Sequence, residues 1–293
     1  MEMRPECVPC LIRRVVFEAE EAGGGKAVET TAAATRILGG LFAPGACSAS
    51  VATKVHREVY RLLGDADPYR ELKLRSNDVV LSLYREAEEF VESSDDRLRA
   101  ALLCAVVGNV LDFGIGTEFD SPEVLEGRFR ELLAEGLGHD DTPALREMLE
   151  HAEHVVYLAD NCGEIVLDRL ALTEIARPGT RITLVVKGEP ILTDVTMADI
   201  EGLGIEEIVD EIAESPGFAV GIGVDALNGD FGDWLRKADL VVAKGMANYE
   251  ALSETDIGPV VYLLRTKCSP VAESIGLRKG MNVVKLLPHG GVR

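Results

Sequence analysis

Apolar positions recur at helical spacing through the first half of the chain. The segment 10–22 places them every three or four residues and ends before the glycines at 23–25, which is the pattern of an amphipathic helix. A turn-rich stretch at 113–122 interrupts the pattern. The same spacing predicts further helices over residues 27–38, 48–63, 77–91, 97–111, 123–135 and 143–152.

The second half changes to short β-branched runs bounded by polar or glycine positions. Helical segments such as 163–175 separate these runs. Apolar strands alternating with helices indicate a mostly parallel sheet covered on both faces. We therefore predict a helical N-terminal region, residues 1–152, and an α/β sandwich, residues 153–293, packed around one shared cleft. The predicted strands are 155–159, 182–186, 240–243, 260–264 and a last one, 282–286, that closes the sheet.

Composition narrows the class of protein. Hydrophobic residues make up 47% of the 293 and charged residues 27%, as in ordinary globular proteins. The sequence has no apolar run of the ~20 residues needed to cross a bilayer. Its N-terminus lacks the basic and apolar segments of a signal peptide. We therefore expect a cytoplasmic protein without a membrane partner.

The excess of acidic over basic residues indicates which partners the protein can bind. With 30 basic and 50 acidic residues the net charge is −20, so the surface repels nucleic-acid phosphates and no nucleic-acid partner is expected. A phosphorylated substrate would need local positive charge, from a metal ion or from a well-placed Lys or Arg. The acidity also serves solubility, whatever the partner.

Candidate chemistry follows the predicted strands, because ligands of open α/β sheets bind beyond the carboxyl ends of the strands. Asp160 and Asn161 come directly after the strand at 155–159 and offer the hard oxygen ligands that Mg²⁺ or Mn²⁺ takes. Gly163 allows close approach of a ligand. The alternative is that Asp160 or Asn161 caps the following helix.

Two further strand ends carry polar side chains. Thr193 and Asp194 follow the strand at 182–186, and they provide either a second carboxylate for a metal or another helix cap. Lys244 directly follows the strand at 240–243. It either offers a point charge to a phosphate or lies exposed in a turn. Because these strand ends meet at one edge of the sheet, the polar side chains are predicted to converge on one crevice.

The helical half supplies one more polar pair. Asn109 and Asp112 lie three residues apart, and so on one face of the predicted helix, at the end of an apolar segment. They belong either to a paired polar network in the core, as buried polar groups require, or to the roof of the cleft.

Together these motifs resemble those of the damage-control metal phosphatases, formerly grouped as domain of unknown function 89. The resemblance runs nearly end to end and includes Asp-Asn-Cys-Gly-Glu at 160–164. The pair Cys7 and Cys10 places the chain near the microbial subfamily that carries an N-terminal Cys-x-x-Cys. The matching segments, in chain order, are 7–10, 67–69 with Lys73 and 76–77, 108–114, 160–164, 190–196, 244–250 and 267–268.

The resemblance implies a fold, an activity and a site. The fold is a helical N-terminal region packed on a Rossmann-like three-layer α/β/α sandwich with a mostly parallel sheet. The activity is metal-dependent hydrolysis of phosphomonoesters, either sugar phosphates or damaged phosphometabolites. The implied metal ligands are Asp160, Asn161 and Asp194. The implied catalytic residues are Asp160, Asp194 and Lys244, and the implied substrate-binding residues are Asn109, Asp112, Glu164 and Asn248.

The expected cofactor is a divalent metal (Mg, Mn, Co or Ni), and no nucleotide cofactor is expected. The metal would polarise the phosphoryl group of a small phosphorylated metabolite, and Lys244 would offset charge on its oxygens. Asp160 or Asp194 would also orient the attacking water. The family usually has Asn where this chain has Thr193, which bears on metal geometry and preference. The oligomeric state is left open.

Cys7 and Cys10 leave three alternatives open. They form a redox dithiol if the helix N-terminus lowers their thiol pKa, or half of a zinc site completed by Cys47 or Cys268. Otherwise they are buried structural thiols.

Two rival functions come from other classes. A methyltransferase acting on carboxyl groups with S-adenosylmethionine would use the glycine-rich segment 217–223, and it would bind its methyl donor without metal. A non-catalytic metal- or metabolite-binding protein would bind both ligands without turnover. A hydrolase of the Ser-His-Asp type is not indicated, because no nucleophile-elbow motif accompanies the five histidines.

Overall fold

The alternation of helices and strands is borne out in the computed structural model, which describes residues 1–110, 121–176 and 179–288. The helices of these residues are α1 (Cys7–Glu21), α2 (Ala27–Leu41), α3 (Ser48–Leu63), α4 (Arg70–Glu92), α5 (Arg97–Gly108), α6 (Glu123–Glu135), α7 (Thr142–Leu149), α8 (Glu164–Ile175), α9 (Val224–Leu227), α10 (Asp230–Leu235), α11 (Gly245–Leu252) and α12 (Ser269–Ser274). The strands are β1 (His139–Asp140), β2 (His154–Leu158), β3 (Arg181–Lys187), β4 (Glu211–Ser215), β5 (Leu240–Lys244), β6 (Val260–Arg265) and β7 (Asn282–Leu287).

The strands form one sheet in the order β1-β7-β6-β5-β2-β3-β4. The five strands from β6 to β4 run parallel to one another, whereas β7 pairs antiparallel with β6 and parallel with β1. The prediction of a mostly parallel sheet is confirmed. The last strand does not close the sheet, because β1 lies outside it.

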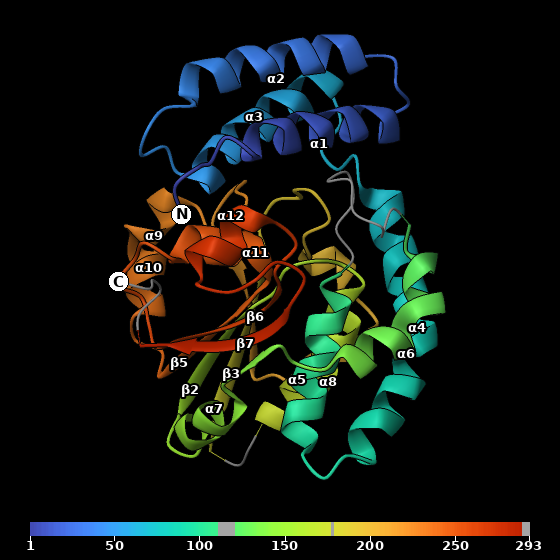
Figure 1. Cartoon of the computed structure of the whole chain (residues 1–293), viewed down its shortest axis with the longest axis vertical. Helices are drawn as coiled ribbons and strands as arrows, with labels where there is room; N and C mark the ends of the chain where they lie inside the picture. Colours follow the sequence, from blue (N-terminus) through green and yellow to red (C-terminus); the bar gives the residue numbers. More distant parts are fainter. Residues whose placement is uncertain (111–120, 177–178, 289–293) are drawn as a thin grey trace.

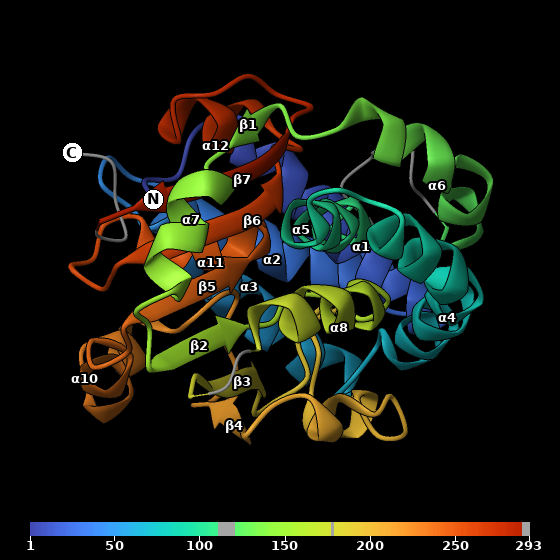
Figure 2. The same ribbon diagram turned by 90° about the horizontal axis from the view of Figure 1, so that it is seen from below.

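Helices cover both faces of the sheet, as the apolar strands predict. Alternate residues of β2 point to opposite sides: Val155 and Tyr157 join the apolar cluster of α4, α5 and α8, whereas Val156 and Leu158 join that of α10 to α12. Figure 2 shows α5 and α8 lying together beside the sheet. The three-layer α/β/α arrangement is therefore confirmed.

Helices α1, α2 and α3 form a separate group at one end of the molecule (Figure 1). They share a small apolar cluster that includes Val15, Leu38 and Val55. The helices α4 to α6 pack instead on the sheet side, where Leu102 and Phe129 lie in the same cluster as the strand residues. The apolar core thus spans residue 152, and the domain boundary there stays a prediction.

Most predicted elements match the observed ones within a few residues, and the helix at 48–63 and the helix at 123–135 match at both ends. Strand β4 was not predicted. It is an edge strand whose Glu211 and Glu214 are exposed, so it lacks the apolar run of a buried strand. In the described ranges no helix has the length and apolar character needed to cross a membrane.

Candidate metal centre and active site

Two loops at the carboxyl edge of the sheet bring the predicted metal ligands together. Asp160 and Asn161 follow β2, and Asp194 lies in the loop that follows β3. An isolated antiparallel bridge pairs Asn161 with Asp194. The backbone N–H of Val195 donates to the carbonyl of Asp160 (2.9 Å), and that of Cys162 donates to the carbonyl of Thr193 (2.8 Å). Backbone pairing therefore fixes the two segments side by side.

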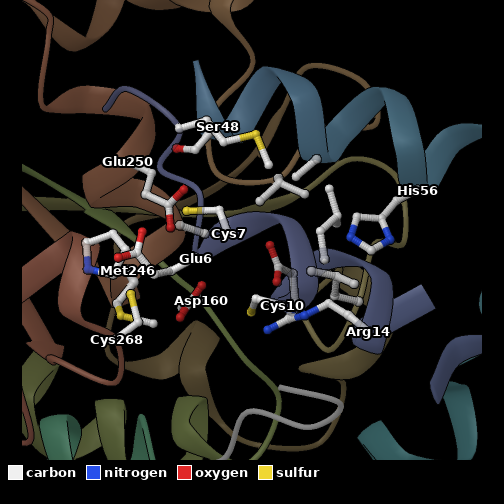
Figure 3. A pocket seen from close by; sticks show the side chains of 18 of the residues that line it. Glu6, Cys7, Cys10, Arg14, Ser48, His56, Asp160, Met246, Glu250 and Cys268 are labelled. Carbon is white, nitrogen blue, oxygen red and sulfur yellow. The ribbon is translucent and has the colours of Figure 1, made fainter. Parts of the chain in front are cut away.

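Asp160, Asn161 and Asp194 line one pocket of about 170 Å³. The opposite wall of the pocket comes from α1, α3 and α11, which contribute Cys10, His56 and Glu250 among others. In Figure 3 Asp160 lies below Glu6, Cys7 and Glu250, with Cys10 to one side. The cleft is thus formed between the sheet edge and the N-terminal helices, as predicted from the sequence.

Asn109, the residue after α5, connects the loop of β2 to the start of α8. Its Nδ2 donates to Oδ2 of Asp160 (2.9 Å) and to Oε2 of Glu164 (2.7 Å). Asn161 Nδ2 donates to the same two oxygens, at 2.7 and 3.1 Å. Two amides therefore orient the carboxylates of Asp160 and Glu164. Asn109 is itself buried and lies outside the pocket lining, so its contact with a substrate stays a prediction. Its predicted neighbour Asp112 lies outside the described residues.

Thr193 takes part in orienting Asn161. Its hydroxyl donates to Oδ1 of Asn161 at 2.6 Å, and the amide of Asn161 is thereby held at both ends. An amide oxygen has two lone pairs, so one remains for a ligand. The Thr that replaces the Asn usual in the resembled family therefore acts on the orientation of Asn161.

Helix α4 holds the loop of β2 from the other side. The backbone N–H of Gly163 donates to Oδ1 of Asn77 at 2.6 Å, and Nδ2 of Asn77 donates to the carbonyl of Asp199 at 2.9 Å. The buried Lys73 forms ion pairs with Asp67 (3.1 Å) and Asp199 (2.7 Å). These contacts tie α4 to both loops that carry the predicted ligands.

Lys187, the last residue of β3, faces Asp194. Its Nζ lies 3.2 Å from Oδ2 of Asp194 and also donates to the carbonyl oxygens of Ala219 and Gly221. Lys187 was not among the predicted site residues, although it ends a strand at the same edge of the sheet as Lys244.

Lys244 is fully buried behind the pocket. Its Nζ donates to the carbonyl of Ala105 (2.6 Å) and lies 2.8 Å from Asp168 and 3.2 Å from Glu164. Burial lowers the pKa of Lys244, but the two carboxylates outweigh this effect and raise it. Burial also raises the pKa of Asp168, to about 7, because one lysine offsets two carboxyl groups only in part. Contact of Lys244 with a substrate phosphate stays a prediction.

Asn248 supports the same edge from α11. Its Nδ2 donates to the carbonyl oxygens of Ala159 (3.1 Å) and Lys244 (2.8 Å), so it links the ends of β2 and β5. Like Lys244 and Glu164, Asn248 is buried and lies outside the pocket lining. Its contact with a phosphate also stays a prediction.

The donor set fits a divalent metal. Asp160, Asn161 and Asp194 present two carboxylates and an amide to one pocket, the oxygen donors that Mg²⁺ and Mn²⁺ take. No three His, Cys, Asp or Glu side chains cluster as a metal site in the part of the chain that the structure describes, and the proposed set has two carboxylates with an amide as its third donor.

The thiols near the pocket bear on the three alternatives for Cys7 and Cys10. Cys7, Cys10 and Cys268 line the pocket, and all are free thiols. Burial raises the pKa of Cys7, the reverse of what a reactive helix-start thiol requires. The lack of a three-residue metal cluster among the described residues argues against zinc. Burial also raises the pKa of Cys162, in line with a packing role.

The glycine-rich segment 217–223 has a local structural use. A Cβ on Gly221 would lie 2.3 Å from the carbonyl oxygen of Ala247, so this close approach to α11 requires glycine. The carbonyl oxygens of Ala219 and Gly221 accept hydrogen bonds from Lys187. The segment therefore packs against α11 and positions Lys187.

Comparison with known proteins gives consistent similarities. A family model described as the damage-control phosphatase ARMT1-like domain matches residues 3–283. The chain is 38% identical over 293 residues to a damage-control phosphatase of Archaeoglobus fulgidus, covering 98% of this chain and 100% of that one. It is 29% identical over 283 residues to a damage-control phosphatase of Pyrococcus horikoshii, covering 96% of each.

The fold is also similar to a solved structure. A crystal structure of a DUF89 family protein from Pyrococcus horikoshii superimposes with a TM-score of 0.84 at 28% sequence identity. The match covers 98% of this chain and 99% of that one. Sequence and fold therefore agree along nearly the whole chain.

Proposed function

The chain belongs to the damage-control phosphatases with an ARMT1-like domain, and from this we propose that it is a metal-dependent phosphomonoesterase of small phosphorylated metabolites. As a member of that family it is an enzyme of the phosphatase kind. The family indicates a divalent metal cofactor, and Mg²⁺, Mn²⁺, Co²⁺ and Ni²⁺ are the proposed candidates.

The observation that carries the proposal is the convergence of two carboxylates and an amide on one pocket. Asp160, Asn161 and Asp194 come from loops after adjacent parallel strands. Oxygen donors at the carboxyl edge of an α/β sheet are where a ligand of this fold binds. We propose Asp160, Asn161 and Asp194 as the metal ligands.

When bound, a divalent cation acts as a Lewis acid on a phosphoryl group. The residues of the chain would prepare that site. Lys187 keeps Asp194 paired with a positive charge at 3.2 Å, Asn109 orients Asp160 and Glu164, and Asp160 or Asp194 would accept a proton from the attacking water. Lys244 would add positive charge from behind Glu164.

The methyl-transfer alternative is not favoured. The family match and both named relatives are phosphatases, and the glycine-rich segment that would serve a nucleoside cofactor packs on α11 and binds Lys187 instead. The non-catalytic alternative remains a distinct outcome of the test below.

The test is release of phosphate from a panel of sugar phosphates and phosphorylated cofactors, with each of the four metals and with EDTA. We expect release with metal and its loss in EDTA. Metal and ligand binding without turnover in folded protein would support the non-catalytic alternative, and binding of S-adenosylmethionine without metal would support methyl transfer.

Two variants test the ligand assignment. Asp160→Asn and Asp194→Asn are each expected to lose at least about a hundredfold in metal-dependent turnover, because each removes a charged ligand. Asp233→Asn is the control, since the Asp233 side chain is 72% exposed and pairs with Arg236 on the surface. Full turnover in both ligand variants would contradict the assignment.

A further inference from the structure

A buried histidine–glutamate pair lies in the wall of the same pocket. His56 belongs to α3 and Glu18 to α1, and their exposed fractions are 1% and 0%. Nδ1 of His56 lies 2.7 Å from Oε1 of Glu18, at ion-pair distance, although the two groups are not aligned as a hydrogen bond. The pair is remote in sequence from the motifs that indicate the metal site.

Glu18 has His56 as its polar neighbour, at 2.7 Å. Neither of its carboxyl oxygens accepts a hydrogen bond from any residue that the structure describes. A buried polar group depends on the partners within its reach. The contact with Glu18 therefore fixes the position of the His56 ring.

The second ring nitrogen of His56 is left for the pocket. Nδ1 faces Glu18, and Nε2 has no hydrogen-bond partner among the residues that the structure describes. His56 lines the pocket together with Asp160 and Asp194. Figure 3 shows its ring on the α3 side of the cavity, apart from Asp160. A buried polar group that faces a cavity without a protein partner calls for a ligand.

The charged side chains that line the pocket indicate what its ligand must offer. Four acidic side chains line it, and its basic lining residues are His56 and Arg14. An anionic ligand in such a pocket needs hydrogen-bond donors, and a ring N–H at Nε2 of His56 is one. The acidic lining residues are Glu6, Asp160, Asp194 and Glu250.

We propose that His56, held by Glu18, donates a hydrogen bond from Nε2 to an anionic oxygen of the phosphorylated substrate, on the wall of the pocket opposite the metal ligands. The proposal rests on the proposed phosphatase function for the identity of its ligand. His56 would be a substrate-binding residue, and Glu18 a positioning residue that acts through His56.

The test measures binding of inorganic phosphate by calorimetry in saturating Mg²⁺, together with KM and kcat for phosphate release. His56→Gln removes the imidazole ring, and we expect phosphate affinity to fall about tenfold or more, with a matching rise in KM and unchanged affinity for Mg²⁺ alone. His139→Gln is the matched control. His139 also pairs with a carboxylate, Asp141, at 3.1 Å, but it lies outside the pocket lining.

Because His56→Gln leaves the buried Glu18 without its imidazole neighbour, a second variant keeps the test decisive. The double variant Glu18→Gln/His56→Gln has a neutral core at this place. If Glu18 acts only through His56, the double variant binds phosphate no more weakly than His56→Gln alone, and Glu18→Gln raises KM with little change in kcat.

Unchanged phosphate affinity and KM in both His56 variants would overturn the inference and leave the phosphatase function standing. Absence of phosphate binding to the wild-type protein in Mg²⁺ would overturn it as well. Conversely, weakened phosphate binding in these variants would support the anion site even if no substrate were turned over, and in that case the proposed function alone would fail.

Discussion

At the scale of single residues, the position of Asp160 depends on a glycine in a neighbouring strand end. Gly245 has a φ of +73°, and a Cβ added to it would lie 1.7 Å from Oδ2 of Asp160. Any other residue at 245 would therefore displace the carboxylate. The glycine follows Lys244 directly, so the strand end that supplies a buried lysine also leaves room for the proposed metal ligand.

Gly245→Ala is expected to reduce Mg²⁺ affinity and phosphate release at least about tenfold, because it moves a metal ligand. Gly276→Ala is the matched control: Gly276 has a φ of +75° but no neighbouring atom within 4 Å of the added Cβ. Both variants carry backbone strain of about 1 kcal/mol, which thermal unfolding measures. Equal activity in the two variants would show that Asp160 tolerates the added methyl group.

A second residue-scale consequence concerns the pH dependence of stability. Burial raises the pKa of Asp168 from 3.8 to about 7. The protonated carboxyl is therefore favoured in the folded state. Its contribution to the free energy of unfolding is complete below the unfolded pKa of 3.8 and is lost as the pH rises through about 7.

We expect the free energy of unfolding in EDTA to fall between about pH 5 and pH 7.5, by at most about 1.4 kcal/mol per pH unit from this group. Asp168→Asn removes the titrating carboxyl, so its stability should change less over the same interval. Urea unfolding of both proteins at each pH measures the difference. Parallel pH profiles would mean that Asp168 keeps an ordinary pKa.

At the scale of elements, the contact between α5 and α8 positions residues of the proposed site. Gly108 ends α5, and a Cβ added to it would lie 2.9 Å from both Cα and Cβ of Glu164, the first residue of α8. Asn109 follows at once and binds Asp160 and Glu164. The close approach of the two helices therefore sets the distance over which Asn109 reaches its partners.

Gly108→Ala is expected to lower stability by about 1–3 kcal/mol through overpacking, and to reduce turnover because Asn109 moves. Gly39→Ala makes the same change inside α2, where no atom lies within 4 Å of the new Cβ. Gly39→Ala should instead stabilise the protein by about 0.5–1 kcal/mol, because Ala has the higher helix propensity. Chemical unfolding measures the change in the free energy of unfolding of each variant. An increase in both variants would exclude overpacking at Gly108.

The elements were largely predictable because each central strand and amphipathic helix carries its own periodic pattern. The buried strands β2, β3, β5, β6 and β7 are continuous apolar runs, which a parallel sheet covered on both faces requires. The apolar pattern does not predict β4, because the exposed Glu211 and Glu214 interrupt the apolar run of this edge strand. Nor does it predict the two-residue β1, which is defined by its pairing with β7.

At the scale of the whole molecule, convergence of strand ends was the predictable part of the site. It follows from sheet topology, and it placed Asp160, Asn161 and Asp194 in one pocket. The contributions of His56 and Glu18 could not be predicted, because α1 and α3 reach the pocket through packing that no local pattern encodes. For Lys244, the position at a strand end was predicted, but its burial against Asp168 and Glu164 was not.

The two-sided construction of the pocket has an evolutionary consequence. The floor belongs to the sheet edge, whereas the roof comes largely from helices α1 and α3, which pack through a small apolar cluster of their own. Substitutions in the roof can change which metabolite fits while the proposed metal ligands are untouched. Such a protein can acquire a new substrate range by drift in its first 64 residues, and relatives that share the floor can diverge in the compounds they accept.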